Sequence, residues 1–131
     1  MRIFAALLMF LAAECALDVG PPARTVERFA AATAAQQGEA ACALLTPKAA
    51  QKLPDQGQTC ALALEELGLR VGAVESVAVW GDEAQVRLNG DTMFLQRFEE
   101  GWRIRAAGCT PTGEDQPYDC EVEDCCARSS S

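Results

Sequence analysis

The spacing of apolar residues changes from a helical to an alternating pattern near Leu69. Before that point apolar side chains recur every three or four residues, as on one face of an α-helix. After it they alternate with polar side chains, as in a half-buried strand. Helices followed by antiparallel strands predict an α+β domain in which the helices pack on one face of the sheet.

The sequence predicts three helices in the first half of the chain. They cover residues 24–38, 39–45 and 60–68. The first has Thr25 available as N-cap and Gly38 as its end, and the third has Thr59 and Gly68 in the same roles. After the second helix, Thr46-Pro47 restarts one helical turn, because Pro is tolerated there and Thr can cap it.

Three tight-turn signals divide the second half into about four strands. They are Gly81-Asp82, Asn89-Gly90 and Glu100-Gly101. In the second strand, Ala84, Val86 and Leu88 alternate with polar residues, so one face is expected to be buried. The last two strands, residues 92–98 and 101–107, are expected to form a hairpin in which Phe98 faces Trp102 or Ile104. The predicted sheet is a curved antiparallel meander.

Residues 1–16 have the pattern of a secretory signal peptide. One Arg precedes an apolar run, residues 3–13, that is too short to span a bilayer. Three outcomes remain open: cleavage near Cys15 or Ala16, lipidation of Cys15, or an uncleaved anchor. The segment LAAEC is similar to a bacterial lipobox, although Glu14 departs from that pattern. We expect an exported protein that is extracellular or, where Cys15 carries a lipid, attached through it to the outer face of the cell membrane.

The rest of the chain is interpreted as one domain with short flanking segments. Residues 17–23 are a predicted linker, residues 24–123 a single α+β domain, and residues 124–131 a flexible tail. Six cysteines follow Cys15, and six allow fifteen pairings. Their positions favour Cys42 with Cys60, each on the apolar side of a short helix, and Cys109 with Cys120, at the two ends of a polar loop. Such bonds persist outside the cytosol.

Cys125 and Cys126 are adjacent and can bridge each other only in a strained ring. They are interpreted as thiols in a frayed tail, with a labile redox or intermolecular pair as the alternative. A structural zinc site is not expected, because the chain has no His and its last four cysteines lack two separated C-x-x-C motifs.

The net charge of −8 argues against a nucleic-acid partner, which needs a concentrated basic surface. Without His, an acid or base would have to be a carboxylate with a raised pKa. The candidates all lie at predicted hairpin turns, where acidic residues are expected as turn formers: Asp82, Glu83, Asp91, Glu99 and Glu100. We therefore assign no catalytic residue and no cofactor.

Aromatic residues in the second half have two possible roles. They are Trp80, Phe94, Phe98, Trp102 and Tyr118. At alternating strand positions they are expected in the core, with a pocket lining as the alternative. Tyr118 lies between Cys109 and Cys120, where it can pack as an anchor or give its hydroxyl to the loop.

Several segments carry a resemblance to known proteins: VERFAAA, ACALLTP, VWGDEAQVRL, FLQRFEEGWRIRAAGCTP and QPYDCEVE. Over residues 24–123 the chain resembles small exported proteins of high-GC Gram-positive bacteria. The element order is similar to the nuclear transport factor two-like cone fold, shared by ketosteroid isomerases and SnoaL-like cyclases. The resemblance implies a cone-like fold and says little about activity.

Two functions follow as hypotheses. The first is a non-enzymatic binding or accessory domain of the cell envelope, stabilised by disulfides, whose partner is an unknown small molecule or envelope protein. The alternative is an isomerase or cyclase that uses a buried carboxylate in a cone-shaped pocket.

Overall fold

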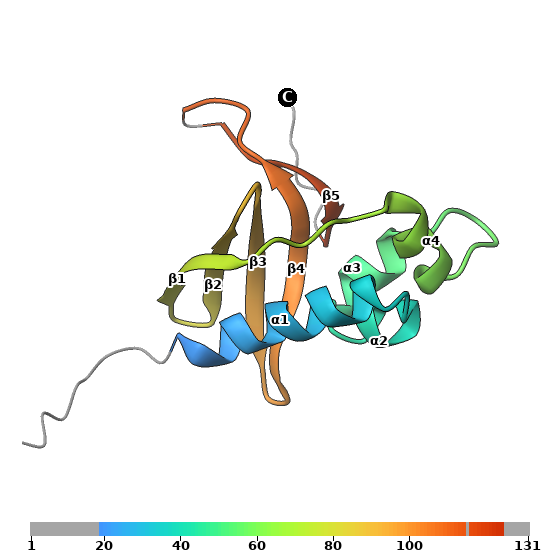
Figure 1. Cartoon of the computed structure of the whole chain (residues 1–131), viewed down its shortest axis with the longest axis horizontal. Helices are drawn as coiled ribbons and strands as arrows, with labels where there is room; N and C mark the ends of the chain where they lie inside the picture. Colours follow the sequence, from blue (N-terminus) through green and yellow to red (C-terminus); the bar gives the residue numbers. More distant parts are fainter. Residues whose placement is uncertain (1–18, 115, 125–131) are drawn as a thin grey trace, which may run out of the picture.

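The computed structural model describes residues 19–114 and 116–124. Within them, helices pack on one face of an open antiparallel sheet (Figure 1). The helices are α1 (Gly20–Ala34), α2 (Gly38–Cys42), α3 (Pro47–Lys52) and α4 (Cys60–Leu67). The strands are β1 (Val74–Trp80), β2 (Glu83–Leu88), β3 (Asp91–Phe98), β4 (Gly101–Thr110) and β5 (Asp119–Glu123), hydrogen-bonded in that order. The predicted α+β class is confirmed, whereas the predicted counts of three helices and about four strands are each one too low.

Helix α1 begins four residues before the predicted start. Pro21 and Pro22 lie in its first turn, where a backbone N–H has no partner within the helix. Thr25 is therefore inside the helix, and its Oγ1 donates to the carbonyl of Pro21 at 3.1 Å instead of capping the N-terminus. Residues 20–23 of the predicted linker are helical.

Gly38 begins α2 and does not end α1. The chain leaves α1 through Gln36, which has a left-handed φ of 56°. A Cβ on Gly38 would lie 2.8 Å from the Cβ of Ala61 in α4, closer than two such atoms approach. Glycine at this position therefore lets α2 and α4 pack closely, and the Cys42–Cys60 disulfide joins the same two helices.

The predicted caps of the last two helices are confirmed. Thr46 accepts a hydrogen bond from the Ala49 N–H at 3.1 Å, and Thr59 accepts one from Leu62 at 3.1 Å. Gly68 ends α4 with a left-handed φ of 60°. The turn predicted after Thr46 continues for six residues as α3, which accounts for the additional helix.

The residues between α2 and α3 dock directly onto the edge of β4. Thr46 N–H donates to the carbonyl of Ile104 at 2.8 Å, and Ile104 N–H donates to the carbonyl of Leu44 at 2.8 Å. These two bonds fill part of the β4 edge beyond the end of β5. The helical layer is thus held to the sheet by backbone hydrogen bonds as well as by side-chain packing.

The core lies between the helices and the sheet and consists mainly of aliphatic side chains. Phe29 of α1 and Leu45 are fully buried against the strands. The strand residues of this core are Ala84, Val86, Leu88, Met93, Leu95, Ile104, Ala107 and Val122. The alternation predicted for β2 is confirmed, because its three apolar residues all enter this core.

The hairpin of β3 and β4 has a different register from the predicted one. Phe98 pairs with Gly101, whereas Trp102 faces Arg97 and Ile104 faces Leu95. Strand β4 is also longer than predicted and continues to Thr110. It pairs there with β5, a strand whose first two residues belong to the predicted polar loop and which is not among the predicted strands.

The pairing of β5 with β4 continues into the first residue of the predicted tail. Asp124, assigned to the tail, donates its backbone N–H to the carbonyl of Arg105 at 2.8 Å. None of the described helices has both the length and the apolar character needed to cross a membrane.

Candidate functional site

The sheet face away from the helices, here called the open face, carries polar and aromatic side chains. Cross-strand pairs on this face include Gln85 with Phe94, and Trp80 with Glu83. They alternate along the strands with the residues that enter the core. Since no helix of the described chain packs there, groups on the open face remain accessible to a ligand.

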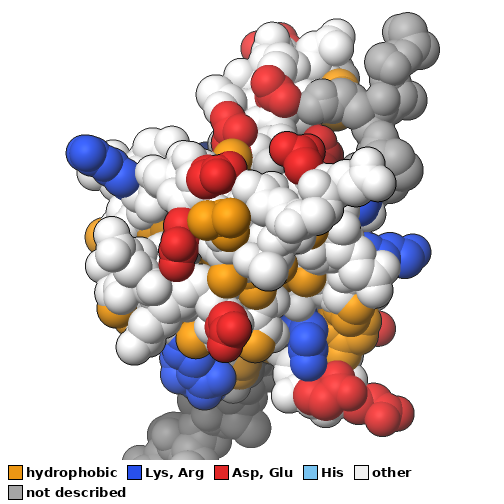
Figure 2. Space-filling model, turned by 90° about the vertical axis from the view of Figure 1, so that its right-hand side faces the viewer, with side chains coloured by type: hydrophobic (Ala, Val, Ile, Leu, Met, Phe, Trp, Pro, Cys, Tyr) orange, Lys and Arg blue, Asp and Glu red, His pale blue; other side chains and the backbone are white. Residues whose placement is uncertain are grey.

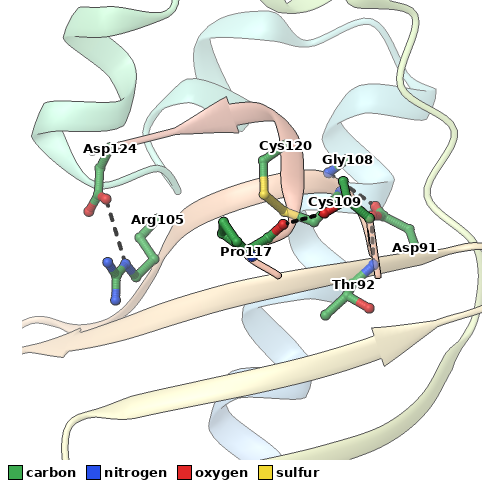
Figure 3. Close-up of a disulfide and its surroundings, with 9 residues drawn as sticks. Asp91, Thr92, Arg105, Gly108, Cys109, Pro117, Cys120 and Asp124 are labelled. Carbon is green, nitrogen blue, oxygen red and sulfur yellow. Dashed lines mark hydrogen bonds and ion pairs between the residues drawn. A yellow bond between two sulfur atoms is a disulfide. The ribbon is translucent and has the colours of Figure 1, made fainter. Parts of the chain in front are cut away.

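Asp91, the first residue of β3, binds the backbone of β4 through its carboxylate (Figure 3). Oδ1 accepts hydrogen bonds from the N–H groups of Thr92 and Cys109 at 2.6 and 2.7 Å, and Oδ2 accepts one from Gly108 at 3.3 Å. The β3–β4 register shifts beside this point, so these β4 N–H groups need an acceptor outside the regular ladder. Burial raises the pKa of Asp91, and the three N–H groups oppose that rise.

The Cys109–Cys120 disulfide ties β5 to β4 next to Asp91. The two residues face each other across the strands, with their Cα atoms 4.0 Å apart. The loop between them is closed further by Thr112, whose hydroxyl donates to the carbonyl of Pro117 at 2.9 Å. Both links restrict the loop that carries Tyr118.

Tyr118 packs down on the open face against Phe94. The ring centroids are 5.2 Å apart and the planes meet at 70°, an edge-to-face contact. Tyr118 thus packs as an anchor, one of its two expected roles. Its ring shares one groove with Cys120 and another with Cys109.

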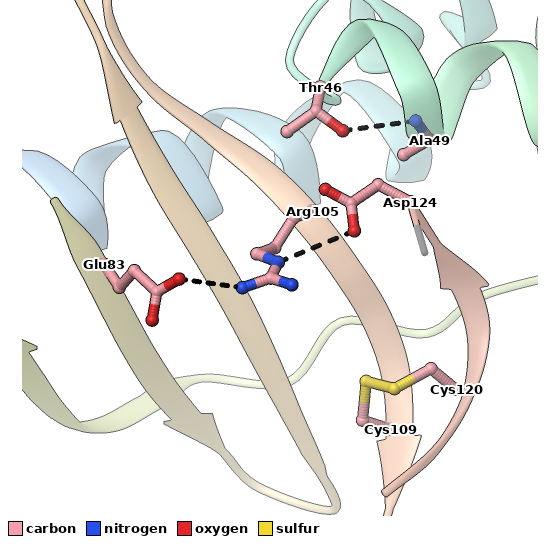
Figure 4. Close-up of polar contacts among 7 residues, drawn as sticks. All are labelled: Thr46, Ala49, Glu83, Arg105, Cys109, Cys120 and Asp124. Carbon is pink, nitrogen blue, oxygen red and sulfur yellow. Dashed lines mark hydrogen bonds and ion pairs between the residues drawn. A yellow bond between two sulfur atoms is a disulfide. The ribbon is translucent and has the colours of Figure 1, made fainter. Parts of the chain in front are cut away.

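Arg105 crosses the open face from β4 and connects an acid on β2 with the acid that follows β5 (Figure 4). Its Nη1 lies 3.0 Å from Oε1 of Glu83 in β2, and its Nε lies 3.6 Å from Oδ1 of Asp124. Because the Arg105 side chain is about one-third exposed, solvent screens these pairs and their contribution to stability is small. Their effect is to hold the guanidinium over β3.

Two shallow grooves share Tyr118 as a lining residue. The first, the Asp91 groove, has a volume of about 280 Å³ and is lined by Glu75, Arg87, Leu88, Gly90, Asp91, Thr92, Cys109, Thr110, Pro111 and Tyr118. The second, the Arg105 groove, has about 190 Å³ and is lined by Phe94, Arg105, Ala106, Tyr118, Cys120, Glu123 and Asp124. The disulfide contributes one cysteine to each. Aromatic surface and fixed polar groups therefore converge on one part of the open face, as in binding sites.

A further groove lies on the helix side of the molecule, between the end of α1 and α4. It measures about 420 Å³ and includes Leu64, Glu65 and Arg70. On this side, where α2 and α4 lie, acidic and basic side chains are scattered among apolar and neutral ones (Figure 2). The groove has no aromatic wall, so it offers less to a ligand than the open face does.

The structure joins both favoured cysteine pairs. Cys42 and Cys60 link α2 to α4, with their Cα atoms 6.3 Å apart, and Cys109 and Cys120 link β4 to β5. The first pair is remote from the grooves, whereas the second lines them. Cys15, Cys125 and Cys126 lie outside the described residues.

The five carboxylates considered for catalysis have separate environments. Asp82 pairs with Arg97 at 2.7 Å in an exposed ion pair, and Glu83 pairs with Arg105. Glu99 and Glu100 are exposed at the β3–β4 turn. Only Asp91, among these five, lies at a groove with its pKa raised by burial.

The expectation that the aromatic strand residues form the core is wrong. Trp80 is 47 % exposed, while Phe94, Phe98, Trp102 and Tyr118 are half-buried. Phe94 and Tyr118 line grooves, which was the alternative, and Trp102 packs at the margin of the core. The helices lie close enough to the sheet for aliphatic side chains to fill the space between them.

Sequence reasoning missed Arg105 and Asp124 as site residues. The acidic partners of Arg105 come from β2 and from the residue after β5, far from it in the sequence. Asp124 had been assigned to the tail. The alternation in the segment CEVE was a usable signal for β5, since Cys120 and Val122 share a period of two.

Within the described residues no three Cys, Asp or Glu side chains are grouped as a metal site requires. Comparison with protein-family models, with curated proteins and with solved structures finds no match for the chain. The function must therefore be argued from the geometry of the chain itself.

Proposed function

We propose that the protein is an exported binding or accessory domain of the cell envelope that holds its ligand in the two grooves around Tyr118. The observation that carries this proposal is the convergence of Tyr118, Asp91 and Arg105 on the open face, each already fixed by other groups. A site with few rotamers to order loses less entropy on binding.

Export is supported by two observations. The pattern of residues 1–16 is that of a signal peptide. Two disulfides join parts of the described chain, and such bonds persist in oxidising compartments. Together they favour an extracellular protein or one attached to the outer face of the membrane, with Cys15 as the residue through which a lipid would anchor it.

We also propose that this fold is related to the nuclear transport factor two-like cone fold. This relationship is supported by the order of helices before strands and by the packing of all helices on one sheet face. In the alternative function, an isomerase or cyclase of this fold, a carboxylate must point into a cavity between helices and sheet. That space is filled here by Phe29, Leu45 and the strand residues opposite them.

The environment of Asp91 is the one observation that favours an isomerase or cyclase. Its raised pKa suits a general base, and it lines a groove. However, both carboxylate oxygens accept backbone N–H groups, and the groove is on the open face. The binding domain is therefore the better-supported function.

The test measures binding of purified protein to envelope fractions of the producing cells. The Tyr118→Ala variant removes the ring shared by both grooves, and we expect its affinity to fall about tenfold, as for a buried aromatic anchor. Leu62→Ala is the matched control, because it removes an apolar side chain that is 48 % exposed on α4. Melting curves check that both variants are folded. Equal affinity of Tyr118→Ala and the wild type would overturn the proposal.

A further inference from the structure

The ionised side chains of the two grooves are largely paired within the protein. Both oxygens of Asp91 accept backbone N–H groups. Glu83 and Asp124 share the guanidinium of Arg105. In the Asp91 groove, Glu75 and Arg87 have no partner within the described chain, and their charges are opposite. A cationic ligand would meet Arg87, and an anionic ligand would meet Glu75 and Asp91. This balance favours a ligand without net charge.

Hydrogen-bonding groups in the Asp91 groove are nevertheless available. Within the described chain, no partner bonds the hydroxyls of Thr110 and Tyr118 or the guanidinium of Arg87. Hydroxyls both donate and accept, and the guanidinium presents several donors in one plane. A ligand with many hydroxyl groups can use donors and acceptors together, whereas an apolar ligand would leave them unpaired.

The aromatic pair adds an apolar surface beside these polar groups. Phe94 supports Tyr118 edge-on, so the Tyr118 ring is held at the boundary of the two grooves. A pyranose ring has the matching character, because its C–H groups form an apolar face and its hydroxyls project from the edge. Aromatic side chains with one apolar and one polar part suit such surfaces.

Two small grooves that share Tyr118 as a wall suit a ligand made of linked units. Their volumes, about 280 and 190 Å³, are each below the roughly 300–1,000 Å³ of a site for a drug-sized molecule. Each can take one ring of a chain, and the shared Tyr118 places the two rings next to each other.

We propose that the open face binds a neutral oligosaccharide, with adjacent sugar units in the Asp91 and Arg105 grooves and the Tyr118 ring between them. This inference rests on the proposed binding function and names its ligand class. Arg87 and Thr110 hydrogen-bond the hydroxyls of one unit, and the Phe94–Tyr118 pair contacts the apolar face of the other.

The first experiment titrates ¹⁵N-labelled protein with neutral glycans and follows the amide signals by NMR. The probes are cellotetraose, chitotetraose and mannotetraose, followed by a printed array of neutral glycans. Tetragalacturonate and tetralysine serve as anionic and cationic comparators. We expect at least one neutral glycan to shift the amides of Gly90, Thr110 and Tyr118. Binding should weaken about tenfold or more in Tyr118→Ala, persist in Tyr118→Phe, and be unchanged in Leu62→Ala.

Two results would overturn the oligosaccharide proposal in that experiment. One is the absence of binding to every neutral glycan of the array. The other is tighter binding of tetralysine or tetragalacturonate than of any neutral glycan, with shifts at the same amides.

A second experiment separates this inference from the broader function. Envelope fractions are treated with protease or extracted with chloroform and methanol, and Tyr118-dependent binding is measured again. Binding that survives both treatments supports a glycan. Loss after protease identifies a protein partner, and loss after solvent extraction identifies a lipid. Either loss overturns the oligosaccharide proposal and leaves the envelope-binding function standing, whereas binding that never depended on Tyr118 overturns the function itself.

Discussion

Asp91 follows the Asn89-Gly90 turn, and its position in the sequence suggests nothing beyond a turn residue. In the folded chain it joins β3 to β4, because the N–H groups of Gly108 and Cys109 point at its carboxylate. Those donors are 17 and 18 residues away in the sequence. A role that depends on such distant partners is not visible in a local pattern.

The raised pKa of Asp91 has a defined consequence for stability. A native carboxyl with a raised pKa keeps its proton at pH values where the unfolded chain, with an ordinary value near 3.8, has lost it. Stability therefore falls as the pH rises between the two values. We expect the free energy of unfolding of the wild type, relative to Asp91→Asn, to decrease with pH over this window and to level off above it.

Urea denaturation from pH 3.5 to pH 7 measures this difference. Glu99→Gln is the control, because it removes one exposed carboxyl from the next turn without touching the backbone N–H groups. We would reject the raised pKa of Asp91 if the free energy of unfolding of the wild type, relative to Asp91→Asn, stayed constant or grew with pH.

Among the elements, β5 differs most from expectation. It is short, and a polar loop separates it from β4, so its pattern resembles a loop that returns to a cysteine. Pairing with β4 and the burial of Val122 make it a strand. For β3, three successive apolar residues, Met93 to Leu95, left open which of its faces is covered. Register with β2 places Met93 and Leu95 inward and Phe94 on the open face.

The two disulfides link different pairs of elements. Their removal is therefore expected to have different effects on ligand binding. Their sequence separations of 18 and 11 residues correspond to about 3 kcal/mol of stability each, from the restricted unfolded chain. We expect both double Cys→Ser variants, at Cys42 with Cys60 and at Cys109 with Cys120, to unfold at lower urea concentration. Only the second variant should also lose Tyr118-dependent binding, because only that disulfide lines the grooves.

Denaturation curves and the envelope-binding assay together check this prediction. Titration of thiols in the native protein provides the control for bond formation. Free thiols at these four positions in the wild type, or equal binding losses in both variants, would refute it.

At the scale of the whole molecule, the helices and the sheet enclose an aliphatic core and leave one sheet face open. The aromatic residues, which were expected inside, lie at the core margin or on that face. The molecule therefore offers its recognition chemistry on the open face rather than in an internal cavity. This arrangement favours extended ligands over small molecules that need enclosure.

The proposed export predicts the intact mass of the mature protein. If the signal segment is removed, the intact mass of the protein from its native host should correspond to a chain that begins near Cys15 or Ala16. A mass increased by acyl groups on Cys15 would identify the lipidated form. A mass that includes Met1 to Glu14 would contradict both. The same protein expressed without residues 1–16 is the mass standard.

The sequence by itself determined the helix caps at Thr46, Thr59 and Gly68, the hairpin turns, the buried face of β2 and the two favoured cysteine pairs. These features depend on groups within a few residues of one another, or on the ends of a single loop. The tertiary structure alone decided the fifth strand, the covered face of β3, the Asp91 carboxylate bonds and the partners of Arg105. Each of those depends on which strand lies beside which, and that order is set by packing across the whole sheet.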